Sequence, residues 1–92
     1  MIRSFRCDET RAIYEGQRSK RFGNTQNVIE RKLVMLSAAT TLDDLRSPPA
    51  NRLEALKGDR VGQHSVRIND PFRICFRWTS SGPEDVEVVD YH

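Results

Sequence analysis

Hydrophobic residues recur at helical spacing in one long segment of this 92-residue chain, residues 26–39. Ile29, Leu33 and Leu36 are four and three positions apart, which places them on one face of an α-helix. The charged residues at positions 30–32 lie partly on the opposite side of this helix, which faces solvent. Because such stripes are far more often core than ligand sites, the pattern predicts a helix packed on the interior.

Beyond residue 50 the hydrophobic period changes from helical to two. Apolar and polar residues alternate through 63–69 and 72–78, and 86–89 is a β-branched run. Turn residues such as Asn69-Asp70-Pro71 separate these runs. Together with the opening segment, the pattern predicts strands over residues 2–5, 51–56, 63–69, 72–78 and 86–89.

Two shorter helical segments complete the pattern. Residues 8–15 are expected to form a helix that Gly16 ends, and residues 40–45 start a further turn that Pro48-Pro49 stops. The order of one strand, two helices and four strands predicts an α+β fold. In it a mostly antiparallel sheet of about 4–5 strands carries two to three helices on one face. The length leaves room for one domain, residues 1–92.

Alternation along the strands assigns side chains to the two faces of the sheet. The apolar residues of 72–78 point toward the helices, so Arg73 and Arg77 leave the opposite face, with Arg67 beside them. An antiparallel sheet can keep one face wet, so we expect a row of guanidinium groups in water. By the same rule His64 lies on the core side rather than in a catalytic site.

Composition narrows the class of protein. Hydrophobic residues make up 37% and charged residues 30%, which is typical of a folded globular protein. No apolar run approaches the roughly 20 residues of a membrane span, and the first residues lack the apolar stretch of a signal peptide. We therefore expect a cytosolic protein without a membrane partner. Cys7 and Cys75 show no metal-binding spacing and are expected to be reduced, packed thiols.

Charge is unevenly distributed, although the net charge is only +2. Residues 52–77 carry six cations, five of them Arg, against three anions. A guanidinium grips phosphate with a planar fork, so this distribution favours a polyanionic ligand. A second basic cluster, Arg18, Lys20 and Arg21, lies nearer the N-terminus.

The sequence ends in three side chains that can take part in proton transfer, Asp90, Tyr91 and His92. The terminal carboxylate favours a protonated His92, which can donate a proton, while Asp90 accepts one or orients His92. Tyr91 can stack on a base or hydrogen-bond a phosphate. With arginines nearby, this set suits RNA cleavage by the RNA's own 2′-hydroxyl, which needs a base, cations and an acid. The alternatives are a merely solvated arginine face and a merely polar terminus.

These features together resemble the HigB toxins of bacterial type II toxin–antitoxin systems, within the RelE/ParE superfamily. The resemblance runs nearly end to end. It covers the Met-Ile-x-Ser-Phe opening, the central aliphatic helix, the Leu56-Lys57-Gly58-Asp59-Arg60 turn, Arg67, Arg73 and the Asp-Tyr-His ending.

The resemblance implies a small ribonuclease that cuts mRNA in the A site of the 30S ribosomal subunit, with no metal and no cofactor. It also implies a HigA antitoxin with a helix-turn-helix domain, through which alone operator DNA is bound. Carried over to this chain, Lys57 and Arg73 stabilise the scissile phosphate, and the terminal Asp-Tyr-His supplies proton transfer and substrate contact. Arg60 and Arg67 are weaker candidates for RNA contact. Arg18, Lys20 and Arg21 are candidates for ribosomal RNA on charge alone.

One position departs from the family pattern. Three residues before Lys57, a well-studied branch of the family carries a His regarded as catalytic, and this chain has Glu54 there. A carboxylate can act as a general base, but it cannot act as an imidazole would. Glu54 is therefore either a catalytic group or the salt-bridge partner of a nearby Arg.

Two rival functions share the same fold. ParE-like proteins poison DNA gyrase without cutting RNA, and a third reading is an RNA-binding module that does not cut. ParE-like proteins generally lack the Arg- and His-rich edge that this chain carries, and function follows from the site rather than the fold. The sequence therefore predicts an mRNA endonuclease ahead of both.

Overall fold

The computed structural model describes residues 1–90, so Tyr91 and His92, both predicted to be catalytic, lie outside the described residues. The α-helices are α1 (Asp8–Tyr14) and α2 (Gln26–Ala38). The strands are β1 (Glu54–Ala55), β2 (His64–Arg67), β3 (Phe72–Thr79) and β4 (Gly82–Asp90). Short 3-10 helices are η1 (Gly23–Thr25), η2 (Leu42–Arg46), η3 (Pro49–Asn51) and η4 (Gly58–Arg60).

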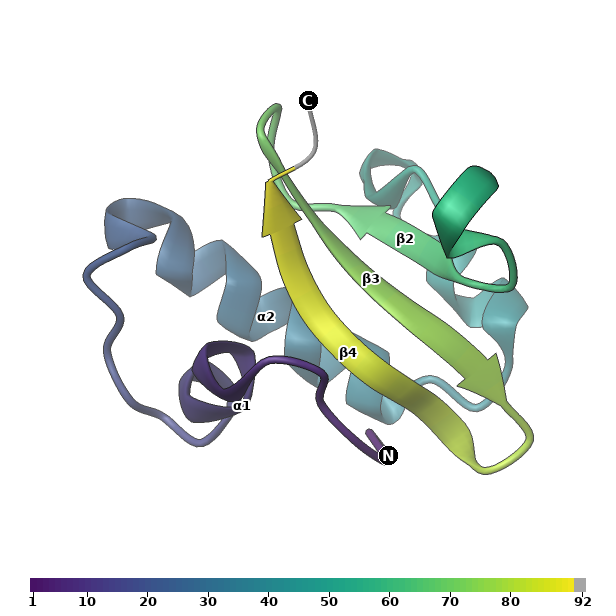
Figure 1. Cartoon of the computed structure of the whole chain (residues 1–92), viewed down its shortest axis with the longest axis horizontal. Helices are drawn as coiled ribbons and strands as arrows, with labels where there is room; N and C mark the ends of the chain where they lie inside the picture. Colours follow the sequence, from purple (N-terminus) through teal and green to yellow (C-terminus); the bar gives the residue numbers. More distant parts are fainter. Residues whose placement is uncertain (91–92) are drawn as a thin grey trace.

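The four strands form one antiparallel sheet in the order β1-β2-β3-β4. Each strand pairs with its neighbour in the sequence, as short connections allow. In Figure 1, α2 passes behind β3 and β4, and α1 lies beside β4. The predicted α+β class, with a mostly antiparallel sheet and helices on one face, is confirmed. Within residues 1–90 no helix has the length and apolarity needed to cross a bilayer.

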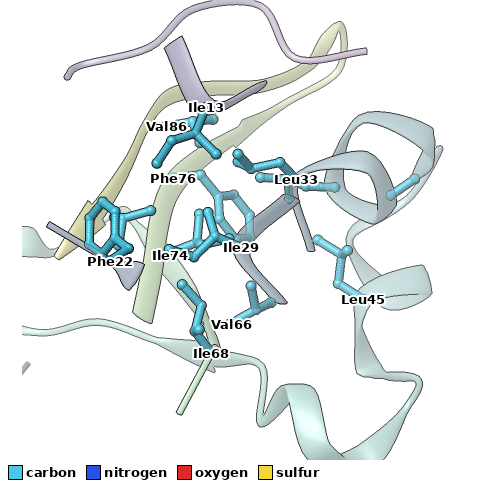
Figure 2. Packing of buried hydrophobic residues seen from close by; sticks show 13 residues of the cluster. Ile13, Phe22, Ile29, Leu33, Leu45, Val66, Ile68, Ile74, Phe76 and Val86 are labelled. Atoms are coloured by element: carbon cyan, nitrogen blue, oxygen red, sulfur yellow. The ribbon is translucent and has the colours of Figure 1, made fainter. Parts of the chain in front are cut away.

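The hydrophobic core lies between α2 and the sheet (Figure 2). Ile29, Leu33 and Leu36 of α2 have no exposed surface, and they share one buried cluster with Ile74 and Phe76 of β3. Each such side chain contributes about 1.5–3 kcal/mol when it is fully buried. The helical stripe and the alternation of β3 are therefore both confirmed, and they fix which face of the sheet stays without helices.

The helices near the N-terminus follow their sequence signals. The segment predicted over residues 8–15 is α1, which Gly16 ends at a φ of 96°. His64 also lies as expected, because its ring is half-buried on the core side and stacks on Phe76 with centroids 6.3 Å apart. The alternation rule thus held at a polar position as well as at apolar ones.

The predicted strand over residues 2–5 is wrong as a regular strand. The segment runs parallel to β4, but it makes a single bridge, Phe5 to Val86. A bulge in β4 explains this, since Asp85 has a φ of 54° and its N–H donates to the Ser4 hydroxyl instead of a backbone carbonyl. A bulge disrupts the ladder locally, and so the N-terminal segment covers the edge of β4 without extending the sheet.

The predicted strand over residues 51–56 shrinks to the two residues of β1. Asn51 instead ends η3, which Pro49 begins, and Arg52 adopts a left-handed backbone at φ 45° and ψ 54°. Proline at the first position favours a helical turn, and a left-handed residue cannot continue a strand. This change of direction matters for the site, because it leaves the carbonyl of Arg52 where the side chain of Arg73 reaches it.

Candidate active site

The face of the sheet opposite the helices, here called the site face, is defined by strand register. Directly paired residues of antiparallel strands point to the same side. One line of paired residues crosses all four strands, namely Glu54, Ser65, Cys75 and Glu87. A second line lies toward the end of β4, namely Arg67, Arg73 and Val89. The prediction that Arg67 and Arg73 share a face is confirmed.

Arg73 lies across β2 rather than out in water, and only 9% of the residue is exposed. Its Nε donates a hydrogen bond to the Ser65 hydroxyl at 2.7 Å, and its Nη2 donates to the carbonyl oxygen of Arg52 at 2.8 Å. The expected row of water-exposed guanidinium groups is therefore wrong at Arg73. The reason is that a hydroxyl on β2 and a carbonyl ahead of β1 accept hydrogen bonds that water would otherwise accept.

A buried polar network fixes the chain just before Arg52. Asn51 has no exposed surface, and its Nδ2 donates to the carbonyl oxygens of Leu45 at 3.1 Å and Ser47 at 3.3 Å. Its Oδ1 accepts a hydrogen bond from Nζ of Lys32 on α2. Burial lowers the pKa of the Lys32 ammonium, and the nearby Arg31 charge lowers it further. The network ties η3 to α2 and so holds the Arg52 carbonyl in place.

Glu54 and Lys57 border an open hollow along β1, which is an edge strand of the sheet. The hollow, about 370 Å³ in volume, is lined by residues 54–57. Both side chains are exposed, and Glu54 points to the site face because it pairs with Ser65. Within residues 1–90 no ion pair of 4.0 Å or less joins Glu54 to an arginine. The salt-bridge alternative for Glu54 thus has no support in that part of the chain.

Arg60 forms an ion pair across the site face. Its Nη1 donates to Oε1 of Glu87 at 2.9 Å and to Oε1 of Gln63 at 3.0 Å. Nε of Arg6 lies 4.0 Å from the same Glu87 oxygen. Contact of Arg60 with RNA stays a prediction, whereas its pairing with Glu87 ties η4, the turn that follows Lys57, to β4.

Other charges near the site face also have partners. Arg67 forms an ion pair with Asp70 in the turn after β2, and Nε of Arg77 lies 4.0 Å from Oδ2 of Asp85 at the bulge. Between these pairs Cys75 has no exposed surface, and burial raises the pKa of its thiol. Arg60, Arg67 and Arg77 are thus each paired with a carboxylate around a buried thiol, so the site face is not an unbroken row of free cations.

Asp90 ends β4 at the same end of the sheet as Arg73. Val89 pairs with Arg73 and Asp90 pairs with Phe72, so Asp90 starts from the side of the sheet opposite Arg73. The residue is exposed. Asp90 and Arg73 thus occupy neighbouring positions on paired strands, whereas the register places their side chains on different faces.

The basic cluster of residues 18–21 lies in the loop between α1 and α2, apart from the site face. In Figure 1 the loop between α1 and α2 occupies the side of the molecule away from β2. Arg18 and Lys20 are exposed. Arg21 forms an ion pair with Glu9 at 3.1 Å and lies over the ring of Phe22, with its Cζ 5.0 Å from the centroid. The cluster is a separate surface, in which Arg18 and Lys20 present the exposed charge.

The donor set on the site face suits a phosphate better than a metal ion. Across residues 1–90, no three side chains of His, Cys, Asp or Glu come together as metal ligands would. Arg73, with its fixed guanidinium, and Lys57 at the neighbouring edge offer N–H donors, which bind anions. Fold and site together define a small α+β protein with an anchored arginine on the sheet face opposite the α-helices.

Comparison with known proteins identifies the family. Residues 3–92 match the family described as RelE-like toxin of type II toxin-antitoxin system HigB, and the chain belongs to it. It is similar to Toxin HigB-1 of Vibrio cholerae serotype O1, with 40% identity over 68 residues that cover 72% of each chain. An uncharacterized protein of Haemophilus influenzae is 38% identical over 68 residues, covering 74% of this chain and 67% of that protein. The resemblance inferred from the motifs is confirmed.

Sequence reasoning missed the groups that hold Arg73. Ser65 was readable in principle, since alternation along β2 puts it on the face of Arg67. The role of the Arg52 carbonyl was not readable, because a left-handed backbone is expected at Gly or Asn and not at Arg. The pairing of Arg60 with Glu87 joins residues 27 positions apart in the sequence, and no local pattern predicts such a contact.

Proposed function

We propose that this HigB-family toxin is a ribosome-dependent mRNA endoribonuclease that acts in the cytoplasm. In this proposal the 2′-hydroxyl of the message attacks the adjacent phosphate, the 5′-oxygen leaves, and the products carry 2′,3′-cyclic phosphate and 5′-hydroxyl ends. The reaction consumes no water and needs no metal or cofactor. It requires a base, an acid and cations near the phosphate.

The observation that carries the proposal is the anchored guanidinium of Arg73. A fixed, water-excluded cation stabilises negative charge that develops on a phosphate better than a mobile surface side chain does. A guanidinium has five N–H donors, so holding two acceptors is compatible with binding a phosphate. Family membership is the reason to expect a toxin, and the anchored guanidinium of Arg73 is the reason to expect stabilisation of a phosphate charge.

The remaining roles follow from the chemistry of each group. Lys57 would share the phosphate charge from the hollow beside β1, and Glu54, exposed at the same edge, would serve as the general base. Among the terminal residues, His92 would protonate the leaving oxygen, Asp90 would accept a proton or orient His92, and Tyr91 would contact the flanking nucleobase. Arg60, Arg67, Arg18, Lys20 and Arg21 would contribute RNA contacts.

Family membership implies a cognate antitoxin, and we propose that it is HigA-like, with a helix-turn-helix domain. The other partners in the proposal are the 30S subunit and its message. Operator DNA would be contacted through the antitoxin alone.

The deciding experiment adds purified protein to a cell-free translation reaction and maps breaks in the message by primer extension. Cuts within codons in the A site, bearing cyclic phosphate ends, are expected with ribosomes and not with naked message. Deletion of His92 is expected to remove most of the cutting. Intact message at an excess of protein, with translation otherwise normal, would refute the proposal.

The same samples separate the rival functions. A gyrase inhibitor would accumulate cleaved DNA in a gyrase assay and leave messages intact. A plain RNA-binding module would show salt-sensitive retention of RNA without cut products.

A further inference from the structure

We propose that Ser65 and the backbone of Arg52 are positioning groups for the reaction, acting by holding the Arg73 guanidinium at the angle that a scissile phosphate needs. This inference rests on the proposed endoribonuclease function and adds two residues to it. Neither resemblance to the family nor the sequence pattern pointed to them. The observations that carry it are two hydrogen bonds and one backbone conformation.

The first contact is the bond from Nε of Arg73 to the Ser65 hydroxyl, 2.7 Å long and buried. Ser65 itself has no exposed surface, so it cannot touch an RNA bound at the surface. Any effect of its hydroxyl on the reaction must therefore pass through a neighbour, and Arg73 is the side chain that its oxygen accepts from. Nε is the donor closest to the aliphatic stem, and fixing it sets the orientation of the whole planar group.

The second contact is the bond from Nη2 of Arg73 to the Arg52 carbonyl, 2.8 Å long. Arg52 adopts the left-handed region at φ 45°, which costs energy for a residue with a Cβ. The conformation persists because the buried Asn51 is tied on one side to Leu45 and Ser47 and on the other to Lys32. The hydrogen bonds of Asn51 thus hold the strained turn in place, and the turn directs the Arg52 carbonyl toward Arg73.

Two contacts from different elements restrain the arginine against its own flexibility. An unrestrained Arg side chain samples many rotamers, and ordering it during catalysis would raise the barrier. Here the folded protein already orders the side chain of Arg73. One hydrogen bond comes from β2 and the other from the segment before β1. The guanidinium is ready before the message arrives, as transition-state stabilisation by fixed donors requires.

The test compares the cleavage kinetics of wild type and four variants on ribosome-bound message. Wild type is compared with Ser65→Ala, which removes the hydroxyl and adds no bulk. Thr10→Ala is the matched control, because Thr10 is equally buried but its hydroxyl accepts from the Val88 N–H instead. Arg52→Gly and Arg52→Val both remove the exposed side chain, whereas only Gly tolerates the left-handed backbone.

Ser65→Ala and Arg52→Val are each expected to lower kcat roughly 10- to 100-fold with little change in KM, because a misplaced group costs that much in rate. Thr10→Ala is expected to keep kcat near that of wild type, and Arg52→Gly is expected to keep a higher kcat than Arg52→Val. Thermal unfolding of every variant accompanies the kinetics. If Ser65→Ala fails to fold, the Gly and Val variants of Arg52 decide, since equal kcat for the two would overturn the backbone role.

A spectroscopic arm does not depend on cleavage. In NMR spectra the Nε–H of Arg73 should exchange slowly with water in the wild type and in Thr10→Ala, and rapidly in Ser65→Ala. Unchanged kcat in Ser65→Ala, or lost kcat with Nε–H still protected, overturns the inference. Absence of cleavage by the wild type refutes the proposed function instead, and the two failures are thus distinguishable.

Discussion

Arg73 is the residue on which the proposed chemistry depends most. Burying a charged group costs free energy unless hydrogen bonds compensate it, and here the Ser65 hydroxyl and the Arg52 carbonyl both accept from it. A protein keeps such a group where its charge has a use. An exposed ion pair such as that of Arg46 with Asp43 contributes little by comparison.

Arg73→Ala should therefore lower the rate of ribosome-dependent cleavage by about 100- to 1,000-fold, the loss typical for removal of one donor to a transition-state oxyanion. Arg73→Lys should recover only part of it, because an ammonium keeps the charge and loses the fork. Single-turnover cleavage of ribosome-bound message measures both. A wild-type rate in Arg73→Ala would mean that the phosphate binds elsewhere.

Cys75 gives a prediction that does not depend on activity. Its side chain has no exposed surface, and burial raises the pKa of the thiol above its ordinary 9.0, which keeps it protonated at neutral pH. In a Cys7→Ser variant, a thiol reagent should therefore label Cys75 only as fast as the protein unfolds, and labelling should be complete in denaturant. Cys75→Ser, which leaves the half-buried Cys7, is the control. Rapid labelling of native Cys7→Ser would contradict the burial.

At the scale of residues, the sequence predicted correctly which face of the sheet a side chain occupies. It did not predict which groups that side chain contacts. Alternation was enough to put Arg67 and Arg73 together, because side-chain direction in a strand depends on local backbone geometry alone. It failed for the exposure of Arg73, since burial depends on what folds over the strand. One group that Arg73 contacts is the carbonyl of Arg52, placed by a backbone conformation that Arg rarely adopts.

At the scale of elements, the strength of the periodic signal decided which predictions held. The helix predicted over residues 26–39 is α2 (Gln26–Ala38), because more than three turns of consistent spacing leave little alternative. The strands predicted over 2–5 and 51–56 were short, and nonlocal events overrode them. A bulge at Asp85 broke the pairing of the first, and with the turn through Asn51 and Arg52 only Glu54–Ala55 of the second remains a strand.

The 3-10 helix η2 is stabilised by a capping box whose effect should depend on pH. The Asp44 carboxylate accepts hydrogen bonds from the Thr41 and Thr40 backbone N–H groups, and these lower its pKa below the ordinary 3.8. A depressed carboxyl pKa contributes stability above pH 3.8, which is lost as the pH falls through the lowered value. Asp44→Asn should thus have a lower Tm than wild type at pH 7, and this gap should close below pH 3.8.

Thermal unfolding at a series of pH values measures the gap. Asp43→Asn is the matched control next in the sequence, because Asp43 forms an exposed ion pair with Arg46 and such pairs contribute little. A gap between wild type and Asp44→Asn that stays constant down to pH 2 would show that the carboxylate charge does not support the cap.

For the whole molecule, charge is divided between two separate surfaces. The site face holds Arg67 and Arg73 on β2 and β3, while the loop between α1 and α2 carries Arg18 and Lys20 on the side away from β2 (Figure 1). In the proposed function the toxin would meet ribosomal RNA on several sides. This division suggests that one surface performs chemistry and the other supplies nonspecific attraction, which is salt-dependent and does not change the reacting groups.

The double variant Arg18→Ala/Lys20→Ala should therefore raise KM for ribosomes several-fold while kcat stays near that of wild type. Loss of two phosphate contacts should also reduce the slope of log affinity against log salt by about 1.4, at roughly 0.7 per contact with single-stranded nucleic acid. The matched control is Arg31→Ala/Arg46→Ala, which removes two exposed cations outside the loop and changes net charge from +2 to 0 in the same way. If both double variants shift KM and the salt slope equally, net charge alone attracts the ribosome, and the loop has no special part in binding.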